Sequence, residues 1–338
     1  MIIEMHPDSS QAQVKEVEHK ARSLKLDVQM NLGTSKTIVA LLGDNTGQID
    51  TDLFAVLPGV QSVTRVMKPY KLASREFKQD DTTIDIDGLT IGDNRIIVMA
   101  GPCAVENKEQ LMEAARAIKR AGASVLRGGA FKPRTSPFSF QGLGKDGLEL
   151  LVQAKDGVGL PIITEVLDTQ HVNLVSEYAD ILQIGARNMQ NFNLLTKVGK
   201  TLRPALLKRG LSASVTEWMA AADYLLAQNN TQVSLCERGI RTFETSSRFS
   251  LDICSIPVVK QNSHLPLIVD PSHAAGHYSL VSSIAKAAVA AGADGLIIEV
   301  HPNPKEAMSD GLQALTPSDF ARLMEELKPI AASLGRTI

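Results

Sequence analysis

The chain has 338 residues, a net charge of −2 and a composition that is 44% hydrophobic but only 4% aromatic. This length accommodates a barrel of about 250 residues together with one small domain. The small net charge excludes nucleic acid and anionic membranes as general partners. No apolar run reaches the length of a membrane span, no basic leader precedes the first strand, and three cysteines are too few for a disulfide framework, so we expect a cytoplasmic protein.

Residues 1–68 are predicted to form a small domain, followed by a polar linker at residues 69–80. Strand-like and helix-like patterns follow the order strand, helix, strand, strand, helix, strand. The predicted strands are Ile2–Met5, Leu26–Leu32, Thr37–Leu42 and Val60–Met67, and the predicted helices are Ser9–Leu24 and Thr46–Leu57. This order is typical of a ferredoxin-like α+β fold.

Residues 81–338 are predicted to form a second, larger domain. Its first segment, Thr82–Ile91, alternates on both sides of Asp87-Gly88, a pair that favours a type I′ hairpin turn. Short apolar runs then recur with helical segments between them. The eight runs are Ile96–Ala100, Ser124–Leu126, Pro161–Thr164, Ile181–Ile184, Ala205–Leu207, Gln232–Leu235, Leu265–Val269 and Gly295–Ile298.

Eight strand–helix units predict a (β/α)8 TIM barrel of the α/β class, and we expect the hairpin to plug the end where the strands begin. A doubly wound open sheet is the alternative. It is less consistent with the sequence, because no GxGxxG follows the first strand and eight units are many for an open sheet.

Positively charged residues gather directly after the predicted barrel strands, at the end where barrel enzymes carry out their chemistry. They come from four strands and are Arg127, Lys132, Arg187, Lys208 and Arg238. Because five like charges repel one another, we predict a polyanion between them, such as two phosphate groups or a phosphate and a carboxylate. Glu165 and Glu237 are available as salt-bridge partners for single cations, but they cannot balance all five.

A second group at the same strand ends consists of Cys103, His273, Glu299 and Asp310. A thiolate, an imidazole and two carboxylates suit a divalent transition metal better than magnesium. Their spacing is long-range, so no local motif identifies the site. Taken alone, Cys103 could be a buried small residue, and His273 a general base. We interpret the other two cysteines, Cys236 and Cys254, as packing residues.

Seven segments of the chain carry a resemblance to a known family; they are AGPCAVE, LRGGAFKPRTSPFSFQGLG, QIGARNMQNF, LLKRG, CERGIRTFE, VDPSHAAG and IIEVHPNP…SDG. Together they resemble 3-deoxy-D-arabino-heptulosonate 7-phosphate (DAHP) synthase, type I-beta, with an N-terminal ferredoxin-like regulatory domain. The resemblance implies a metal-dependent (β/α)8 transferase at the entry of the shikimate pathway of aromatic amino-acid biosynthesis. Such an enzyme joins phosphoenolpyruvate to erythrose 4-phosphate and releases inorganic phosphate.

The resemblance also implies roles for individual residues. The implied ligands of one divalent ion (Mn²⁺, Fe²⁺, Zn²⁺ or similar) are Cys103, His273, Glu299 and Asp310. The implied phosphoenolpyruvate-binding residues are Arg127, Lys132, Gly185, Ala186, Arg187, Lys208 and Arg238. The implied erythrose 4-phosphate-binding residues are Lys132, Pro133, Arg134 and Thr135. The implied catalytic set is Lys132, Cys103, His273 and Asp310, with Lys132 as our hypothesis for the proton donor to the new alkoxide.

Three alternatives stay open. The sister enzyme, 3-deoxy-D-manno-octulosonate 8-phosphate synthase, uses arabinose 5-phosphate, but it typically carries a KANRS-like run where this chain has KPRTS at residues 132–136, and it lacks the N-terminal domain. A Schiff-base aldolase using Lys208 leaves the cysteine, histidine and carboxylates unexplained. A catalytically inert amino-acid-sensing protein leaves the full set of site residues unexplained.

The resemblance further implies regulation and assembly. Tyrosine or phenylalanine is the expected effector of the N-terminal domain, and Gln29 and Asn31 on one face of a predicted strand are candidates for contacting it. The family analogy suggests a homotetramer.

Overall fold

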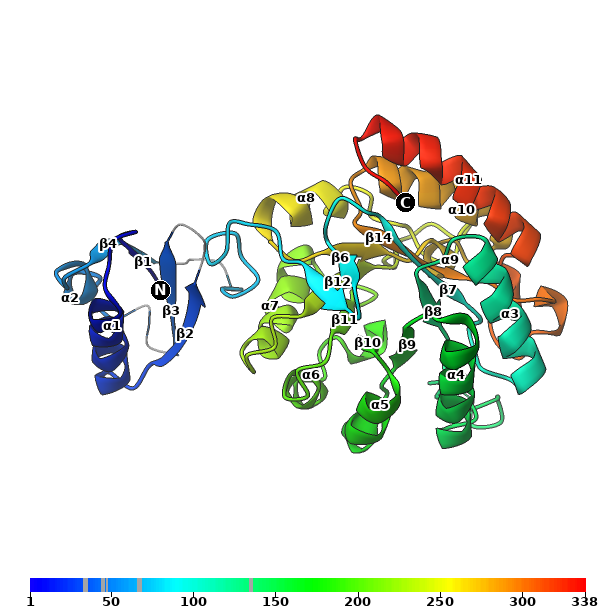
Figure 1. Cartoon of the computed structure of the whole chain (residues 1–338), viewed down its shortest axis with the longest axis horizontal. Helices are drawn as coiled ribbons and strands as arrows, with labels where there is room; N and C mark the ends of the chain where they lie inside the picture. Colours follow the sequence, from blue (N-terminus) through cyan, green and yellow to red (C-terminus); the bar gives the residue numbers. More distant parts are fainter. Residues whose placement is uncertain (33–35, 44–45, 47, 66–68, 134–135) are drawn as a thin grey trace. The chain divides into compact units, whose positions relative to one another are not determined.

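The computed structural model describes residues 1–338 except 33–35, 44–45, 47, 66–68 and 134–135. The chain divides into two compact units (Figure 1). Unit 1 comprises Met1–Asp81 with Asn262–His264, and unit 2 comprises Thr82–Gln261 with Leu265–Ile338. The predicted domain boundary at residue 68 lies outside the described residues.

Unit 1 contains a four-stranded sheet in the order β2-β3-β1-β4, with antiparallel neighbours. Its elements are β1 (Ile2–Met5), α1 (Gln11–Ser23), β2 (Asp27–Leu32), β3 (Thr37–Leu42), α2 (Asp52–Ala55) and β4 (Val60–Thr64). Helix α1 begins where Ser10 and Gln13 cap each other's backbone N–H groups. Met5, Val17, Leu41 and Phe54 are fully buried between the helices and the sheet. The predicted ferredoxin-like fold is confirmed.

The second helix of unit 1 is much shorter than predicted. We expected Thr46–Leu57, whereas α2 spans only Asp52–Ala55. The Asp50 carboxylate accepts a hydrogen bond from the Asp52 N–H at 3.1 Å and so competes for the backbone that a longer helix would use. The predicted end of the last strand at Met67 lies outside the described residues, and β4 ends at Thr64.

Unit 2 is a closed barrel of eight parallel strands, as the apolar runs predict (Figure 1). Its strands are β7 (Ile97–Gly101), β8 (Val125–Arg127), β9 (Ile162–Glu165), β10 (Ile181–Ile184), β11 (Ala205–Lys208), β12 (Val233–Glu237), β13 (Leu267–Val269) and β14 (Gly295–Glu299). The strand order runs around a closed circle, so the open-sheet alternative is excluded for the described residues.

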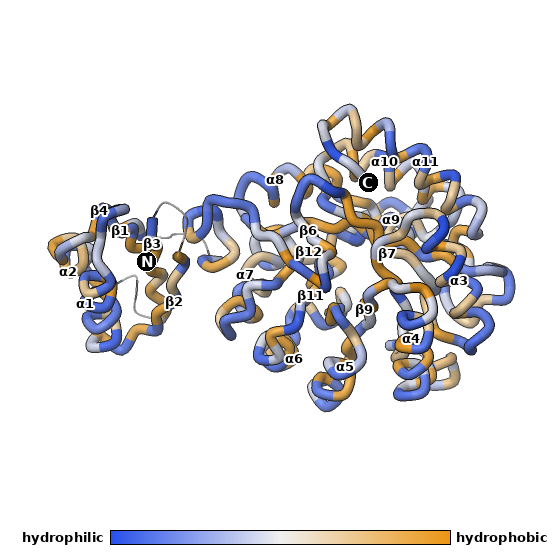
Figure 2. Tube along the Cα trace, viewed as in Figure 1, coloured by the Kyte–Doolittle hydropathy of each residue, from blue (hydrophilic) through white to orange (hydrophobic). Residues whose placement is uncertain are grey.

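Helices surround these strands (Figure 1). They are α3 (Lys108–Arg120), α4 (Lys145–Val158), α5 (Val172–Tyr178), α6 (Phe192–Gly199), α7 (Val215–Leu226), α8 (Ser255–Asn262), α9 (Pro271–Ala275), α10 (Tyr278–Ala290) and α11 (Pro317–Ser333). The 3₁₀ turns in the described part of this unit are Thr169–His171, Ala186–Asn188, Pro304–Glu306 and Gly311–Gln313. Because helices cover the outside, the strands are buried on both faces and their hydropathy is nearly continuous (Figure 2).

The hairpin of β5 (Ile84–Ile86) and β6 (Leu89–Ile91) closes the amino-terminal end of the barrel. Its turn residues, Asp87 and Gly88, both have positive φ (52° and 86°), as the predicted type I′ turn requires. The hairpin isoleucines pack in one cluster with inward-facing residues of the barrel strands, including Ile97 and Val125. The hairpin does not cover the opposite end of the barrel, where the strands end and a pocket lies.

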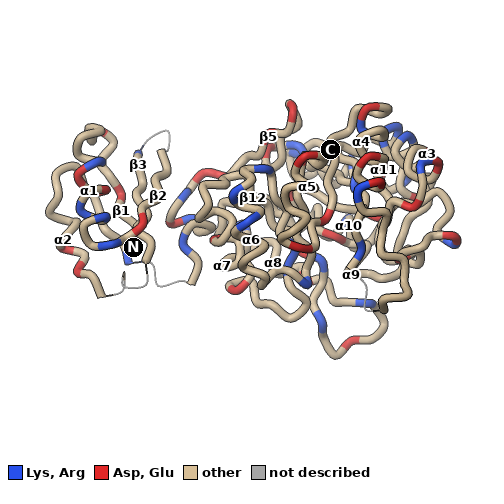
Figure 3. The backbone as a smooth tube through the Cα atoms, turned by 90° about the horizontal axis from the view of Figure 1, so that it is seen from below, with Lys and Arg blue, Asp and Glu red and all other residues tan. Residues whose placement is uncertain are grey.

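Charges of both signs are spread along both units (Figure 3). Among the residues that the structure describes, no helix is long and apolar enough to cross a membrane.

Candidate active site at the carboxyl ends of the barrel strands

A pocket at the carboxyl ends of the strands contains all five of the predicted cations. They are Arg127, Lys132, Arg187, Lys208 and Arg238, and Arg248 joins them from the β12–α8 loop. Two carboxylates, Glu165 and Asp310, also line the pocket, with the neutral lining of Pro133, Gly185 and Ala186. Six cations facing two carboxylates favour an anionic ligand.

Two of these cations are paired with buried carboxylates. Arg127 lies 3.0 Å from Glu299 (Nη1 to Oε1), and both side chains are buried. The Lys208 ammonium forms an ion pair with Asp270. Glu165 and Glu237 were candidate salt-bridge partners of the five predicted cations, but each has another partner. Glu165 accepts a hydrogen bond from Gln183, and Glu237 pairs with Arg209, which is not one of the five.

The remaining cations differ in their surroundings. In the part of the chain that the structure describes, neither Arg187 nor Arg238 forms an ion pair. Arg238 is buried, with its guanidinium 4.2 Å from the centre of the Phe249 ring. Burial lowers the pKa of Arg238 below its usual value. A buried guanidinium without a carboxylate is a strong site for an anion, since the ligand supplies the missing charge.

The second predicted group also comes together. Ligand atoms of Cys103, His273, Glu299 and Asp310 all lie within 4.8 Å of one another. The Cys103 sulfur lies 3.2 Å from the Asp310 carboxylate and 2.9 Å from the Lys132 ammonium. Burial, together with the neighbouring Glu299 carboxylate, raises the pKa of the Cys103 thiol to about 11. A metal ion at this point would favour the thiolate and relieve the crowding of carboxylates.

His273 is oriented as a metal ligand would be. Its Nδ1 atom lies 2.8 Å from Asp270 Oδ2, and its Nε2 atom faces Glu299 Oε1 at 3.4 Å. Burial lowers the pKa of His273, which favours the neutral imidazole that binds metals. The Asp270 carboxylate lies close behind the ring, although the angle at Nδ1 does not meet hydrogen-bond geometry. The donor set therefore fits a divalent transition metal.

Asp310 is held by its loop. It has a positive φ of 51°, a conformation that aspartate tolerates better than most residues. Arg248 donates to the Asp310 carboxylate at 3.2 Å and to Gln313 at 2.7 Å, and Gln313 donates in turn to Glu299 at 2.9 Å. Nearby, Glu106 accepts from the Met308 N–H at 2.8 Å and fixes the same loop. These contacts position two carboxylates of the cluster.

Some functional neighbours could not be found from the sequence. Arg248 and Gln313 lie far from any strand end and reach the site only through loop packing. Asp270 directly follows β13, but its pairing with both Lys208 and His273 could not be predicted from the sequence. Arg134 and Thr135, two predicted substrate-binding residues, lie outside the described residues. Cys236 is buried as expected, but Cys254 is exposed in the turn before α8, because that turn faces outward, so its predicted packing role is wrong.

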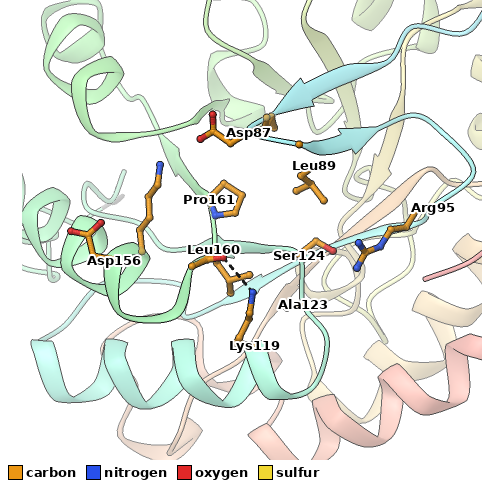
Figure 4. A pocket seen from close by; sticks show the side chains of 13 residues that line it. Asp87, Leu89, Arg95, Lys119, Ala123, Ser124, Asp156, Leu160 and Pro161 are labelled. Atoms are coloured by element: carbon orange, nitrogen blue, oxygen red, sulfur yellow. Dashed lines mark hydrogen bonds between the residues drawn. The ribbon is translucent and has the colours of Figure 1, made fainter.

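A second hollow lies at the amino-terminal end of the barrel, beside the hairpin (Figure 4). Its lysines already have partners within the protein. Lys119 donates to the Gly159 carbonyl at 3.3 Å, and Lys155 lies 2.6 Å from the Asp180 carboxylate. Since barrel enzymes work at the carboxyl ends of the strands, the cationic pocket remains the candidate active site.

A closed parallel barrel with a ring of cations and a candidate metal cluster at one mouth defines the class of (β/α)8 enzymes that act on phosphorylated or carboxylated substrates. The family described as DAHP synthetase I matches residues 76–333, and the DAHP synthase ferredoxin-like domain matches residues 1–68. The chain belongs to the DAHP synthetase I family, and the predicted resemblance is confirmed.

Individual relatives agree. The phospho-2-dehydro-3-deoxyheptonate aldolase of Thermotoga maritima is 47% identical over 335 residues, which cover 99% of both chains. A crystal structure of the T. maritima DAHP synthase superposes with a TM-score of 0.80 at 46% identity, covering 99% of this chain and 98% of that one. The 2-dehydro-3-deoxyphosphooctonate aldolase of Geobacter sulfurreducens is 30% identical over 259 residues, covering 71% of this chain and 94% of that protein.

Proposed function

We propose that the chain condenses phosphoenolpyruvate with erythrose 4-phosphate to give DAHP and inorganic phosphate, the first step of the shikimate pathway. The observation that carries this proposal is the pocket in which six cations adjoin the cluster of Cys103, His273, Glu299 and Asp310. Two substrates that repel each other through their phosphates need such a pocket in order to meet. The pocket lining that supports this assignment includes Arg127, Lys132, Pro133, Gly185, Ala186, Arg187, Lys208 and Arg238, whereas Arg134 and Thr135 lie outside the described residues.

In the proposed reaction, C3 of phosphoenolpyruvate attacks the aldehyde carbon of erythrose 4-phosphate. Water adds to C2, and the C2–O bond to phosphate then breaks. Arg187, Lys208 and Arg238 bind phosphoenolpyruvate in this assignment, because they face the pocket from three neighbouring strand ends. Holding both anions at bonding distance supplies a large part of the rate, since the repulsion is overcome by binding.

The acceptor side is assigned to the β8–α4 loop. Lys132 and Pro133 line the pocket, and Arg134 and Thr135 follow them in the chain. Lys132 is the candidate donor of the proton that the nascent alkoxide takes up, because its buried ammonium lies beside Cys103, one of the candidate metal ligands. A divalent ion held by Cys103, His273, Glu299 and Asp310 supplies Lewis-acid polarisation of the aldehyde oxygen when it is bound.

The sister reaction with arabinose 5-phosphate is the alternative, because relatives with an octonate aldolase name share about 30% identity with the barrel. Those relatives match 71–75% of the chain, whereas the heptonate enzyme matches 99%. Phosphate release from phosphoenolpyruvate should be measured with each aldose phosphate. We expect turnover with erythrose 4-phosphate at least about 10-fold above that with arabinose 5-phosphate; the reverse order would contradict the proposal.

The remaining proposals rest on the family resemblance. We infer a cytoplasmic homotetramer whose N-terminal domain binds tyrosine or phenylalanine as a feedback inhibitor, and an ion such as Mn²⁺, Fe²⁺ or Zn²⁺ in the metal cluster. Gln29 and Asn31 remain the candidate effector contacts. Asn31 already donates to the Phe77 carbonyl at 3.2 Å. Inhibition curves with both amino acids, together with the mass of the assembly in solution, test these proposals.

Lys208 is a poor Schiff-base nucleophile. Attack on a carbonyl needs a free amine, whereas the Lys208 amino group is held in a buried ion pair with Asp270. Borohydride added with substrate should therefore trap no adduct.

A further inference from the structure

Behind the cationic pocket lies a cluster that the proposed reaction does not use: the buried Arg209 and Glu237 and the partly exposed Asp252. The Arg209 guanidinium lies 2.7 Å from the Glu237 carboxylate and 2.9 Å from Asp252. Glu237 is completely buried, and its other oxygen accepts the Gly239 N–H at 2.7 Å. Arg209 also donates to the Ala213 carbonyl at 2.9 Å. These contacts tie together the chain that follows β11 and the chain that follows β12.

Each member of the Arg209–Glu237 pair is next in sequence to a cation of the pocket. Lys208 precedes Arg209, and Arg238 follows Glu237. Lys208 and Arg238 line the pocket, whereas Arg209 and Glu237 do not. Neighbouring residues at a strand end point to opposite sides of the barrel wall, so the pair lies behind the wall and the two cations in front of it.

This arrangement has an electrostatic consequence. Glu237 is the carboxylate closest in sequence to Arg238, but it faces the other side of the barrel wall and does not neutralise that guanidinium. Arg209 and the Gly239 N–H instead satisfy both of its oxygens. Gly239 has a φ of +88°, and a β-carbon there would lie 2.7 Å from the Phe249 side chain, which itself stacks on Arg238. The turn that carries Arg238 is therefore fixed on both sides.

We propose that Arg209 and Glu237 are positioning residues for phosphoenolpyruvate: their ion pair fixes the turns after β11 and β12 and holds Lys208 and Arg238 toward the pocket. This inference rests on the proposed function, in which these two cations bind that substrate. The acceptor is assigned to the β8–α4 loop, and the hydrogen bonds described for the pair reach no described residue of that loop. Loss of the pair should consequently affect one substrate and spare the other.

The test variant is Glu237→Gln, which keeps an oxygen for the Gly239 N–H but loses the charge that Arg209 needs. The matched control is Asp180→Asn, which makes the same change in the Lys155–Asp180 ion pair at the opposite end of the barrel. Phosphoenolpyruvate binding to the full chain is measured by calorimetry, and KM for each substrate is measured by phosphate release.

We expect Glu237→Gln to raise the Kd and KM for phosphoenolpyruvate by about 10-fold or more while KM for erythrose 4-phosphate changes less than about 2-fold. Asp180→Asn should lower the melting temperature without changing either constant. Arg209→Lys, which keeps one ion pair with Glu237 but loses the fork geometry, should fall between the wild type and Glu237→Gln and serves if that variant does not fold.

Equal increases in both KM values, an unchanged phosphoenolpyruvate Kd in a folded variant, or the same increase in Asp180→Asn would overturn the positioning role. A wild-type chain that does not bind phosphoenolpyruvate would instead contradict the proposed function, and the inference with it.

Discussion

Arg127 and Arg238 line the same pocket but have opposite electrostatic surroundings. Arg127 faces the buried Glu299 carboxylate at 3.0 Å, whereas Arg238 stacks on Phe249 and forms no ion pair within the described part of the chain. A buried charge without a partner costs stability, and a buried pair loses stability when one member is removed. The two arginines should therefore respond in opposite ways to the same substitution.

The first prediction concerns these two residues. Arg238→Met should weaken phosphoenolpyruvate binding by about 10- to 100-fold, the loss expected for a hydrogen-bonded charge, while the unfolding free energy stays the same or rises. Arg127→Met should lower the unfolding free energy of the metal-free protein by about 3 kcal/mol, because it leaves Glu299 buried and unpaired. Urea unfolding and calorimetry check both. A large loss of stability in Arg238→Met would refute this reading of its surroundings.

Some residues of the site could be predicted from the sequence and others could not. The ionisable residues at strand ends were predictable, because in a barrel those positions converge whatever the loops do. Arg248 was not, since it lies in the middle of a loop and reaches Asp310 only after the loop has folded back. The pairing of Asp270 with Lys208 required knowledge of which strands are neighbours and how far each side chain reaches.

In strands and turns, close packing decides which positions tolerate a side chain larger than that of glycine. Gly101 ends β7 with a φ of +146°, and a β-carbon at this position would lie 2.1 Å from the Arg127 carbonyl oxygen. Gly88, in the hairpin turn, has a φ of +86°, but a β-carbon there would meet no other atom within 4 Å. Both glycines have unusual backbone angles, but only one is also crowded.

The second prediction follows from this difference. Gly88→Ala should lower the unfolding free energy by about 1–2 kcal/mol, the cost of a left-handed backbone alone. Gly101→Ala should cost clearly more, since the Arg127 backbone must move as well, and we expect a loss above about 3 kcal/mol. Urea unfolding of the two variants side by side checks the order. Equal losses would show that crowding at Gly101 relaxes freely.

The third prediction concerns pH and the segment after α8. His264 Nε2 lies 2.7 Å from the Leu72 carbonyl oxygen and donates to it whenever Nε2 carries a proton, as it does in the Nε2–H tautomer of the neutral ring. Burial, with smaller contributions from Lys78 and Arg75, lowers the pKa of His264 from 6.5 to about 4. As the pH falls below 6.5, the unfolded chain binds a proton on His264 and the folded chain does not, so protonation favours unfolding. On account of His264, the free energy of unfolding should therefore be about 2 kcal/mol lower at pH 5 than above pH 6.5.

The variant His264→Gln can keep the donor to Leu72 and cannot titrate. Its unfolding free energy should fall less between pH 7.5 and pH 5 than that of the wild type, by about 2 kcal/mol. Urea unfolding at both pH values measures the difference. Parallel pH profiles of the two proteins would exclude His264 as the titrating group.

Elements were predicted from the sequence to very different degrees. The barrel strands were recognisable because they are buried on both faces and read as apolar runs between turns. Helix α3 has a clear sequence pattern as well, because its apolar residues recur at helical spacing after the Asn107 cap. The helix predicted at residues 46–57 was too long, because its helical pattern is weak and Asp50 forms a competing local hydrogen bond.

At the scale of the whole molecule, the barrel brings residues from the segments that follow β7, β13 and β14 to one point. Cys103, His273 and Asp310 are more than thirty residues apart in the chain, yet their ligand atoms lie within 4.8 Å of one another and of Glu299. No local motif encodes this cluster; the closed circle of strands does. The cluster therefore forms only in the complete barrel, and we propose that it holds one divalent ion.

The fourth prediction is the effect of removing that ion. Dialysis against a chelator should abolish phosphate release from phosphoenolpyruvate and erythrose 4-phosphate, and added Mn²⁺ should restore it. In Cys103→Ala, restoration should require a higher Mn²⁺ concentration, because one ligand is lost. Circular dichroism of the stripped protein controls for unfolding. Full turnover after verified metal removal would exclude a catalytic metal.

The most direct measurement of the central claim is a crystal structure of the chain soaked with Mn²⁺ and phosphoenolpyruvate, with the metal located by anomalous scattering. We predict one anomalous peak within about 2.6 Å of ligand atoms of Cys103, His273, Glu299 and Asp310, and phosphoenolpyruvate between Arg187, Lys208 and Arg238. A metal peak away from this cluster, or the substrate bound at the hairpin end of the barrel, would contradict the account.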